Sequence, residues 1–354
     1  MRTLVIFALS LTVLLPGFSQ TAASPGASLP KEPHEILAAA APHYDFSSPD
    51  LKPWRMKVSY QFYDMKGRPA EQGTWEYWWA SRKVSRSSWT RGGVEHTTWS
   101  TADGARYRKE SGGPLRYFER TMEPTLLSPL PERGVLDSGK MKLDLKMLPA
   151  DKPVVACVLT TPQRLVNGEL QVSNGVANHY CFDPATLVLR ESYSNQLTTQ
   201  YSQIVKVQGR YLAQQVVVTE DKRKLFTASV ETIDVLNAGD VALAPPADAT
   251  MEKPAQSLHG DGESGVTAGA LVRKQYPIYP AVAKMAHEQG VVVLAATIGT
   301  DGKIHDVEVV ATPSHLLTES AVECVKTWEY KPYLLNGVPV EVETLVNVMY
   351  MMSR

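Results

Sequence analysis

The chain has 354 residues, 44% of them hydrophobic and 21% charged, with a formal net charge of -1. This length can bury core for about two domains at roughly 100 to 200 residues each. The nearly neutral charge gives no reason to expect nucleic acid as a partner.

The N-terminus has the order of a secretory signal peptide. Arg2 precedes an apolar run from Leu4 to Leu15, and Pro16-Gly17 and small residues follow. About twelve apolar residues fall short of the roughly 20 needed to cross a bilayer. We therefore expect residues 1–23 to be a cleaved signal peptide, or a short inner-membrane anchor if cleavage does not occur, and we expect the protein to be exported.

Residues 24–50 are predicted to be a flexible arm. The stretch from Thr21 to Pro33 is rich in Pro, Ala and Ser, a composition typical of mobile segments. Within this arm, residues 34–41 have the pattern of one or two helical turns.

Residues 51–237 are predicted to form a mainly β domain, either an antiparallel meander or an incomplete barrel. Short strand-forming runs are separated by turn residues about every 8 to 12 positions. The alternation around Trp75, Tyr77 and Trp79 places these three aromatic side chains on one face of a strand. They either fill a core or line a cavity. The turn signals are Asp64 to Gly67, Arg91 to Gly93, Asp103-Gly104, Ser111 to Pro114, Asn167-Gly168, Asn174-Gly175, Asp183-Pro184 and Gln208-Gly209.

Two of the three cysteines lie in this β domain. Cys157 and Cys181 flank a turn-rich stretch, and in an oxidising compartment they would form a disulfide that contributes about 3 kcal/mol; the alternative is two buried thiols. Cys324 lies among apolar neighbours and is interpreted as a small core residue.

The second half of the β domain resembles the periplasmic lipoprotein carriers LolA and LolB. The resemblance lies in residues 179–186, in residues 201–209 and in the strand from Tyr211. It implies a curved, incomplete barrel whose concave side holds an apolar ligand. No ligand residue can be carried over from this pattern.

Residues 238–268 are predicted to be a linker. They contain Ala244-Pro245-Pro246, Lys253-Pro254 and several glycines, without a periodic apolar pattern. Such a composition cannot bury enough surface to offset its ordering entropy, so we expect a mobile tether.

The last part of the chain is predicted to be an α+β domain. Pro280 suits the first turn of a helix that Gly290 ends, and residues 291–298 form a continuous apolar run typical of a central strand. Asp301-Gly302 then turns the chain into a strand over residues 304–310.

A second helix and a closing strand follow. Apolar residues recur at helical spacing from Leu317 to Trp328, and Pro332 prevents continuation. A turn at Asn336-Gly337 leads into a strand from Val340 to Met351. We expect two helices on one side of a three-stranded antiparallel sheet, with one face and at least one edge open.

This order resembles the C-terminal domain of the TonB family, to which we assign residues 269–354. The resembling positions include Tyr279-Pro280 and, as structural residues, Gly290, Asp301, Gly302, Trp328 and Pro332. The resemblance implies a Gram-negative periplasmic protein that binds a TonB-dependent outer-membrane transporter, or another outer-membrane protein, by strand pairing. The residues that it implies for partner binding are Ile278, Tyr279, Pro280, Val340, Val342, Thr344, Val346, Val348 and Tyr350. For Tyr279, a core position that fixes the helix start is the alternative.

Two functions stay open. The first is a TonB-family protein that takes part in energy transduction for transport across the outer membrane. A classical member of this family contacts an inner-membrane complex of the ExbB and ExbD type, and this chain departs from that pattern because its apolar N-terminal segment is short and no long Pro-rich rod follows it. The second is a soluble lipid or lipoprotein carrier that uses the TonB-like domain only for docking.

Catalysis is not expected. His287-Glu288 lacks the second histidine of a zinc protease motif, no phosphate loop follows a strand, and no nucleophile stands in a recognisable elbow. We therefore expect no cofactor and no metal.

Overall fold

A computed structural model of the chain describes residues 29–131, 133–137, 139, 141–148, 154–166, 169–172, 178–236, 243–251, 256–257, 266–267 and 270–352. The predicted signal peptide and the turns at 167–168 and 174–175 lie outside these residues. Within them, no helix is both long and apolar enough to cross a membrane.

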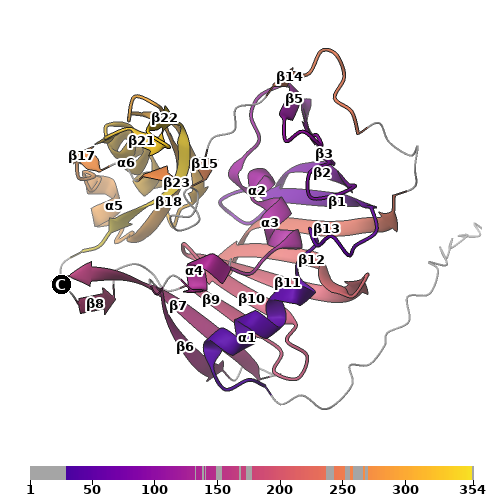
Figure 1. Cartoon of the computed structure of the whole chain (residues 1–354). Coiled ribbons are helices and arrows are strands. Elements are labelled where there is room, and N and C mark those ends of the chain that lie inside the picture. Colours follow the sequence, from indigo (N-terminus) through magenta and orange to yellow (C-terminus); the bar gives the residue numbers. More distant parts are fainter. Residues whose placement is uncertain are drawn as a thin grey trace, which may run out of the picture.

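The N-terminal half of the described chain is one large antiparallel sheet that does not close into a barrel (Figure 1). Thirteen of its fourteen strands run in the order β14-β5-β4-β3-β2-β1-β13-β12-β11-β10-β9-β7-β6. The fourteenth strand, β8, pairs with β7 beside this path. The sheet confirms the predicted mainly β fold. The strands are β1 Trp54–Tyr63, β2 Pro69–Trp79, β3 Ser85–Arg91, β4 Val94–Ser100, β5 Arg106–Ser111, β6 Met141–Leu148, β7 Val155–Val166, β8 Glu169–Val172, β9 Asn178–Phe182, β10 Leu189–Ser194, β11 Leu197–Val207, β12 Arg210–Glu220, β13 Arg223–Val235 and β14 Thr250–Met251.

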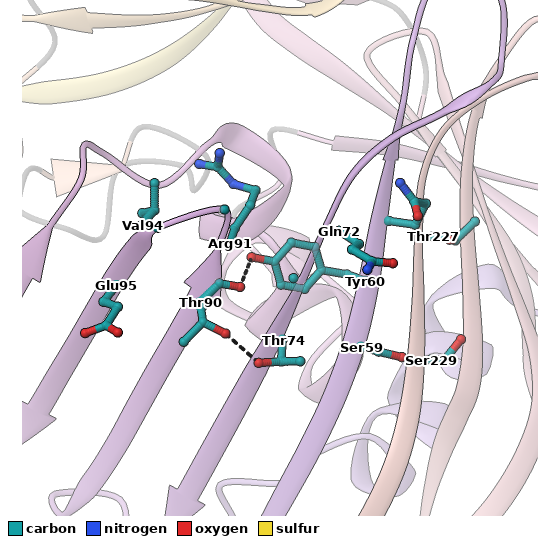
Figure 2. A pocket seen from close by; sticks show the side chains of 14 residues that line it. Ser59, Tyr60, Gln72, Thr74, Thr90, Arg91, Val94, Glu95, Thr227 and Ser229 are labelled. Carbon is teal, nitrogen blue, oxygen red and sulfur yellow. Dashed lines mark hydrogen bonds between the residues drawn. The ribbon is translucent and has the colours of Figure 1, made fainter.

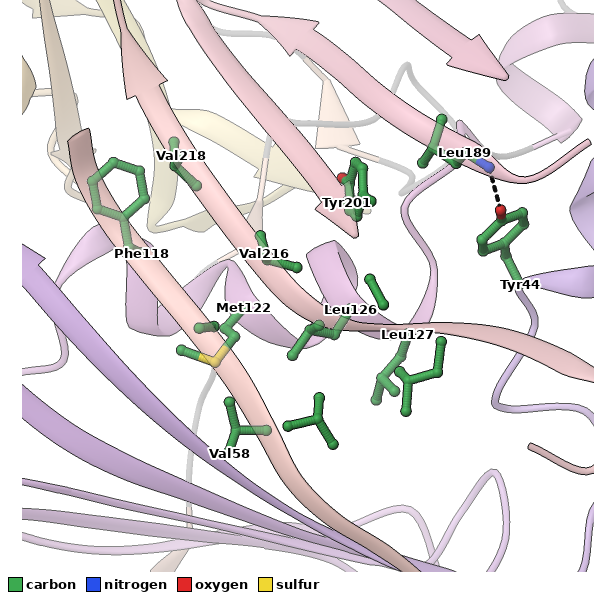
Figure 3. Close-up of a cluster of buried hydrophobic side chains, with 14 of the residues drawn as sticks. Tyr44, Val58, Phe118, Met122, Leu126, Leu127, Leu189, Tyr201, Val216 and Val218 are labelled. Carbon is green, nitrogen blue, oxygen red and sulfur yellow. Dashed lines mark hydrogen bonds between the residues drawn. The ribbon is translucent and has the colours of Figure 1, made fainter. Parts of the chain in front are cut away.

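Short helices pack against the sheet and fill its inner face. They are α1 Pro33–Ala40, the 3₁₀ turn η1 Ala41–His43, α2 Tyr117–Arg120, α3 Met122–Leu127 and α4 Arg133–Asp137. Figure 3 shows Phe118, Met122 and Leu126 packed against Val216 and Val218 of β12. The three aromatic side chains that were predicted to share one strand face, Trp75, Tyr77 and Trp79, belong to the same buried cluster, so they fill a core.

The helical turns predicted over residues 34–41 are confirmed by α1 and η1, but the arm that contains them is not flexible from Pro33 onward. Ile36 and Leu37 of α1 are at most 2% exposed, and Tyr44 and Phe46 are buried in the core of the sheet. The Tyr44 hydroxyl also accepts a hydrogen bond from the backbone N–H of Leu189, at 2.5 Å. Burial of these apolar side chains offsets the entropy cost of ordering the segment. The Pro- and Ser-rich composition before it did not indicate this burial.

A buried ion pair ties α2 to the sheet. Glu119 is fully buried, and Arg91 Nε donates to its Oε1 at 2.9 Å. The Tyr60 hydroxyl donates to the same oxygen, and the backbone N–H of Arg116 donates to Oε2 at 2.7 Å. Glu71 pairs with the far side of Arg91 at 2.8 Å. These partners satisfy charges that would otherwise be costly to bury.

Cys157 and Cys181 form a disulfide between β7 and β9. The two residues lie directly opposite each other in the antiparallel register, with their Cα atoms 3.9 Å apart. The third cysteine, Cys324, is buried as a free thiol.

The C-terminal part is a smaller sheet with the order β15-β23-β18-β19. β23 and β19 are antiparallel to the central strand β18, whereas β15 is parallel to β23. Helix α6 packs on one face of the sheet, and Ser314 Oγ caps it by accepting from the N–H of Leu316 at 3.1 Å. The elements are β15 Gln256–Ser257, β16 Val266–Thr267, β17 Leu271–Arg273, α5 Ala281–Met285, β18 Gly290–Ile298, β19 Ile304–Ala311, α6 His315–Lys326, β20 Glu329–Tyr330, β21 Tyr333–Leu335, β22 Val338–Val340 and β23 Val342–Tyr350.

Three expectations for this part need correction. Val340 belongs to the hairpin strand β22, opposite Tyr333, because the Asn336-Gly337 turn is followed by three paired residues before β23 begins. The predicted linker contributes the short strands β14, β15 and β16, which pair with β5, β23 and β21. Its described residues are therefore not all an unpaired tether.

The third correction concerns the face of the sheet that was expected to stay open. Val293 and Ala295 of β18 and Val310 and Ala311 of β19 are at most 5% exposed, and they belong to the same buried cluster as the N-terminal core. The N-terminal unit covers this face because both surfaces are apolar.

Candidate functional site

The outer edge of β23 is the candidate site. β23 pairs with β18 along its full length, from Val342 to Tyr350, without a register shift. On its other side, the only described pairing is with β15, at Val342 and Glu343. Among the described strands, none pairs with this edge from Thr344 to Tyr350. The backbone groups that point outward there are free to bind another strand.

The side chains predicted to bind a partner mostly point inward. Val342, Val346, Val348 and Tyr350 are at most 7% exposed and pack in the core beneath the helices, and Thr344 is half-buried between them. A partner at this edge would therefore meet the backbone of β23 first. Such pairing depends little on sequence, because main-chain hydrogen bonds form it.

The segment before α5 lies at the end of β23. The Tyr279 ring packs edge-on against Tyr350, with centroids 5.4 Å apart, and its hydroxyl donates to the backbone oxygen of Glu288. Tyr279 is thus a half-buried anchor of the helix start, whereas Ile278 beside it is 83% exposed. The Ser320 hydroxyl holds the Ile278 carbonyl at 2.5 Å. Ile278 thus directly precedes the residue that packs on Tyr350, the last residue of β23, and the two neighbours of Tyr350 in sequence, Met349 and Met351, are also exposed.

The predicted structural residues shape this domain. Gly302 has φ +80°, and a Cβ there would lie 2.0 Å from the carbonyl oxygen of Tyr330. The backbone N–H of Tyr330 donates to the Gly302 oxygen at 2.8 Å, and Asp301 accepts from the N–H of Lys303 at 3.0 Å. Trp328 is buried and its indole N–H donates to the Gln275 carbonyl at 3.0 Å. Gly290 opens β18, and Pro332 follows the strand β20.

The two units of the chain meet at a charged contact that spacing alone did not indicate. Arg120 of α2 pairs with Glu343 at 2.9 Å and with Glu308 at 3.2 Å, and we name these three residues the Arg120 cluster. Both Glu308 oxygens accept from the backbone N–H of Tyr117 at 2.9 Å. Arg223 donates to the Thr312 carbonyl at 2.7 Å.

Burial sets the electrostatics of this contact. It raises the pKa of Glu308, and this outweighs the hydrogen bond from Tyr117 and the Arg120 charge, which lower it. Burial lowers the pKa of Arg120, but the hydrogen bonds that Arg120 donates to Glu343 and the two carboxylate charges raise it overall.

The cavities of the N-terminal unit are small or polar. A cavity of about 210 Å³ lies between α2, α3 and strands β9 to β12, and one of about 160 Å³ lies near Trp54 and Glu123. Both are below the roughly 300 to 1,000 Å³ of ordinary ligand sites. A larger hollow of about 520 Å³ is lined by hydroxyl and amide groups, among them Ser59, Gln72 and the hydrogen-bonded pair Thr74 and Thr90 (Figure 2).

One cluster of metal-ligating residue types occurs among the described residues. Donor atoms of His179, Cys181 and Glu191 lie within 4.8 Å of one another. The Cys181 sulfur is bonded to Cys157, so it is not available as a thiolate ligand. Two donors remain, fewer than the three or four protein ligands of typical zinc sites.

One family model matches the C-terminal part of the chain. Residues 275–352 match the family described as the Gram-negative bacterial TonB protein C-terminal. No curated protein matches the chain.

Three solved structures are similar to parts of the chain. The TonB C-terminal domain of Pseudomonas aeruginosa is 23% identical, with a TM-score of 0.22, and covers 29% of this chain and 100% of its own. A DUF1329 family protein from Desulfovibrio piger is 11% identical, with a TM-score of 0.37, and covers 59% of this chain and 93% of its own. A LolA superfamily protein from Nitrosomonas europaea is 10% identical, with a TM-score of 0.35, and covers 61% of this chain and 96% of its own. The chain thus ends in a module that is similar, over residues 275–352, to the C-terminal region of the TonB proteins of Gram-negative bacteria.

Proposed function

We propose that this is a periplasmic protein whose C-terminal domain binds an outer-membrane protein, in the first place a TonB-dependent transporter, by adding a strand of that partner to β23. The supporting observation is the free, regular edge from Thr344 to Tyr350, in a domain that matches the TonB C-terminal family. The protein takes part in transmitting energy to transport across the outer membrane. Its role is binding and transmission, and no bond is made or broken.

The proposed contact has two parts. Alternate residues of β23 direct their N–H and C=O groups outward, because an antiparallel strand pairs with β18 only through every second residue. An extended partner segment satisfies these groups. Ile278 and Met349, which are 83% and 60% exposed, then contact apolar side chains of that segment.

The test uses the full-length mature chain and a synthetic peptide of a transporter's periplasmic N-terminal segment. Two further peptides carry N-methyl groups at every second residue, one set at odd and one at even positions. Since a paired strand uses alternate amides, one methylated peptide should lose at least tenfold in affinity and the other should bind nearly as the parent peptide. Equal affinity of all three peptides would contradict strand pairing.

A side-chain substitution tests the apolar part. Ile278→Ala should weaken peptide binding about fivefold without loss of stability, because this side chain is almost fully exposed. The matched control is Val272→Ala, which removes an exposed apolar side chain from β17, a strand that pairs with β20 and not with β23. Equal effects of the two substitutions would remove Ile278 from the proposed contact.

A coupling to an inner-membrane complex of the ExbB and ExbD type belongs to the same proposal, and it requires that the N-terminal segment stay uncleaved. Sequencing the mature N-terminus decides this. A start at Met1 in the inner-membrane fraction supports the coupling, and a start near residue 20 or 24 restricts the protein to a free periplasmic adaptor.

The carrier function is the second candidate. The cavity between α2, α3 and strands β9 to β12 supports it, because Phe118, Leu197 and Val218 line that cavity. An acyl chain would fit only if these helices moved away from the sheet. Native mass spectrometry of the purified protein, with extraction of bound lipid, tests this function, and a protein that carries no lipid contradicts it.

A further inference from the structure

The start of the β23 edge is occupied by the chain itself. In β15, Gln256 pairs with Val342 and Ser257 pairs with Glu343 in a parallel register. The proposed partner strand would bind the same edge, and a partner strand that extends past Thr344 would need the backbone of Val342 and Glu343 that β15 occupies. We propose that β15 is an internal competitor for that strand, and that contact between the N-terminal unit and the C-terminal sheet holds it in place. This inference rests on the proposed function and concerns its regulation.

The position of β15 depends on the N-terminal unit through a short tether. β14 pairs with β5 at the outer edge of the N-terminal sheet, through Thr250 and Met251. Five residue steps separate Met251 from Gln256, and they span at most about 17 Å. While β14 stays paired, β15 therefore reaches the β23 edge only when the C-terminal domain lies close to that sheet.

Glu343 takes part both in the pairing of β23 with β15 and in the contact between the two units. Its backbone pairs with Ser257 of β15, and its carboxylate pairs with Arg120 of the N-terminal unit at 2.9 Å. Arg120 also holds Glu308 of β19, so the Arg120 cluster contacts β23 and β19, the two strands that flank the central strand β18. Separation of the two units breaks these ion pairs and withdraws β15 from β23 in the same movement.

The apolar part of the interface favours the closed arrangement. Val293, Ala295, Val310 and Ala311 lie in the N-terminal core cluster, and separation would expose them to water. Partner binding at β23 and separation of the units are consequently coupled, and each favours the other by the same factor. The apparent affinity for a partner strand that extends onto Val342 and Glu343 is the intrinsic affinity multiplied by the fraction of molecules in which β15 has left these residues.

The first arm of the test needs no partner. Amide hydrogen exchange of residues 342–344 is measured in the full-length chain, in Q256P/S257P and in the control Q256A/S257A. Proline removes the backbone N–H that strand pairing uses, and alanine keeps it. Exchange at these residues should be at least fivefold faster in the proline variant and unchanged in the alanine control. Equal exchange in all three proteins would overturn the occupancy of the edge by β15.

The second arm measures affinity for the transporter peptide. Q256P/S257P should bind about tenfold more tightly than the parent chain. R120Q should bind about threefold more tightly, since it weakens the interface but leaves its apolar part. The control R82Q removes a largely exposed arginine that pairs with Asp45, within the N-terminal unit, and should not change affinity.

The outcomes separate the inference from the proposed function. Faster exchange with unchanged peptide affinity overturns competition but leaves strand addition intact, because the peptide still binds. No peptide binding in any variant overturns the proposed function and, with it, the competition. Faster exchange together with tighter binding supports both.

Discussion

The two sheets of this chain differ in what covers their faces and in the charge of their edges. The N-terminal sheet fills its inner face with its own helices α1 to α3, whereas the C-terminal sheet has α6 on one face and obtains cover for the other from the neighbouring unit. The outermost long strands of the N-terminal sheet are rich in charge, with Arg106, Arg108 and Lys109 in β5, beside the two-residue β14, and Lys142 and Lys146 in β6. β23 has no charged residue from Thr344 to Tyr350.

Charged side chains on an edge strand oppose pairing with a foreign strand. The N-terminal sheet is thus protected against strand addition, and the long uncharged part of β23 is not. The only charged residue of β23 is Glu343, where the strand is already paired with β15 and its side chain with Arg120. Under the proposed function, the C-terminal sheet receives a strand at its uncharged edge and the N-terminal sheet serves as a scaffold.

The largest expected effect concerns the self-filled core of the N-terminal sheet. Trp75 is fully buried and stacks on Trp89 with centroids 5.0 Å apart. Trp75→Ala should destabilise the N-terminal unit by about 4 kcal/mol, because it leaves a large cavity. In calorimetry, the transition of the N-terminal unit should move to a lower temperature than in the parent protein. The unfolding temperature of the C-terminal domain should change less. A single transition in both proteins would show that the two regions are not distinct units.

The disulfide should stabilise only the N-terminal unit. It closes a loop with a sequence separation of 24, for which the chain-entropy relation gives about 3 kcal/mol. The double variant Cys157→Ser with Cys181→Ser should lower the free energy of unfolding of this unit by that amount in urea titrations. Peptide binding at β23 should persist under conditions where the unit stays folded. Loss of binding there would contradict the separation of scaffold and site.

The C-terminal domain has its own sensitive position. Gly302→Ala should destabilise this domain by about 2 to 3 kcal/mol, since the added Cβ meets the Tyr330 carbonyl in a left-handed backbone conformation. Gly337→Ala is the matched control, because Gly337 has a similar φ of +82° but no atom within 4 Å of the added Cβ. The control should lose only about 1 kcal/mol. Similar losses in thermal unfolding would show that the close contact at Tyr330 has no energetic role.

The contact between the two units should become more stable as the pH falls. Burial between the units raises the pKa of Glu308, which faces Arg120 and Arg116 and lies near Glu343. A carboxyl group whose pKa is raised by burial stabilises the contact below its ordinary pKa, and this stability is lost as the pH rises through the raised value. The closed arrangement should therefore strengthen on acidification from pH 7 to pH 5. Small-angle scattering should show a smaller radius of gyration at pH 5, and an increase would contradict the assignment.

The smallest effect tests the edges directly. Met349→Lys places a charge on the uncharged edge strand, at a side chain that is 60% exposed, and should weaken peptide binding about threefold. Met147→Lys adds the same charge to β6, which is already charged and where Met147 is 50% exposed. That control should not change peptide affinity. Fluorescence anisotropy with a labelled peptide is sufficient for both measurements.

Much of the fold was predictable because turns and apolar runs are local signals. The hairpins at Gly92-Gly93 and Gln208-Gly209 follow from glycines with positive φ. The hairpins at Asn195-Gln196 and Asp221-Lys222 were missed, because non-glycine residues adopt the left-handed conformation there. Helices α2 and α3 were also missed, since they have only four and six residues and too few turns to show a period.

The site was predictable in part, for the same reason. The free edge of β23 follows from the order of elements, whereas the sequence named Val346 and Val348 as partner-binding residues and did not indicate that they point into the core. The contacts of Arg120 with Glu308 and Glu343 join residues 188 and 223 positions apart, and no local pattern indicates them. The parallel pairing of β15 was hidden for a related reason, because the composition of its segment resembles a linker.

The most direct test is residue-resolved amide exchange along β23 in the intact chain, with and without the transporter peptide. Without peptide, alternate amides from Thr344 to Tyr350 should exchange rapidly, and those that pair with β18 should exchange slowly. Addition of the peptide should slow the rapid set. Slow exchange of every amide in this stretch before the peptide is added would contradict a free edge and, with it, the proposed mode of binding.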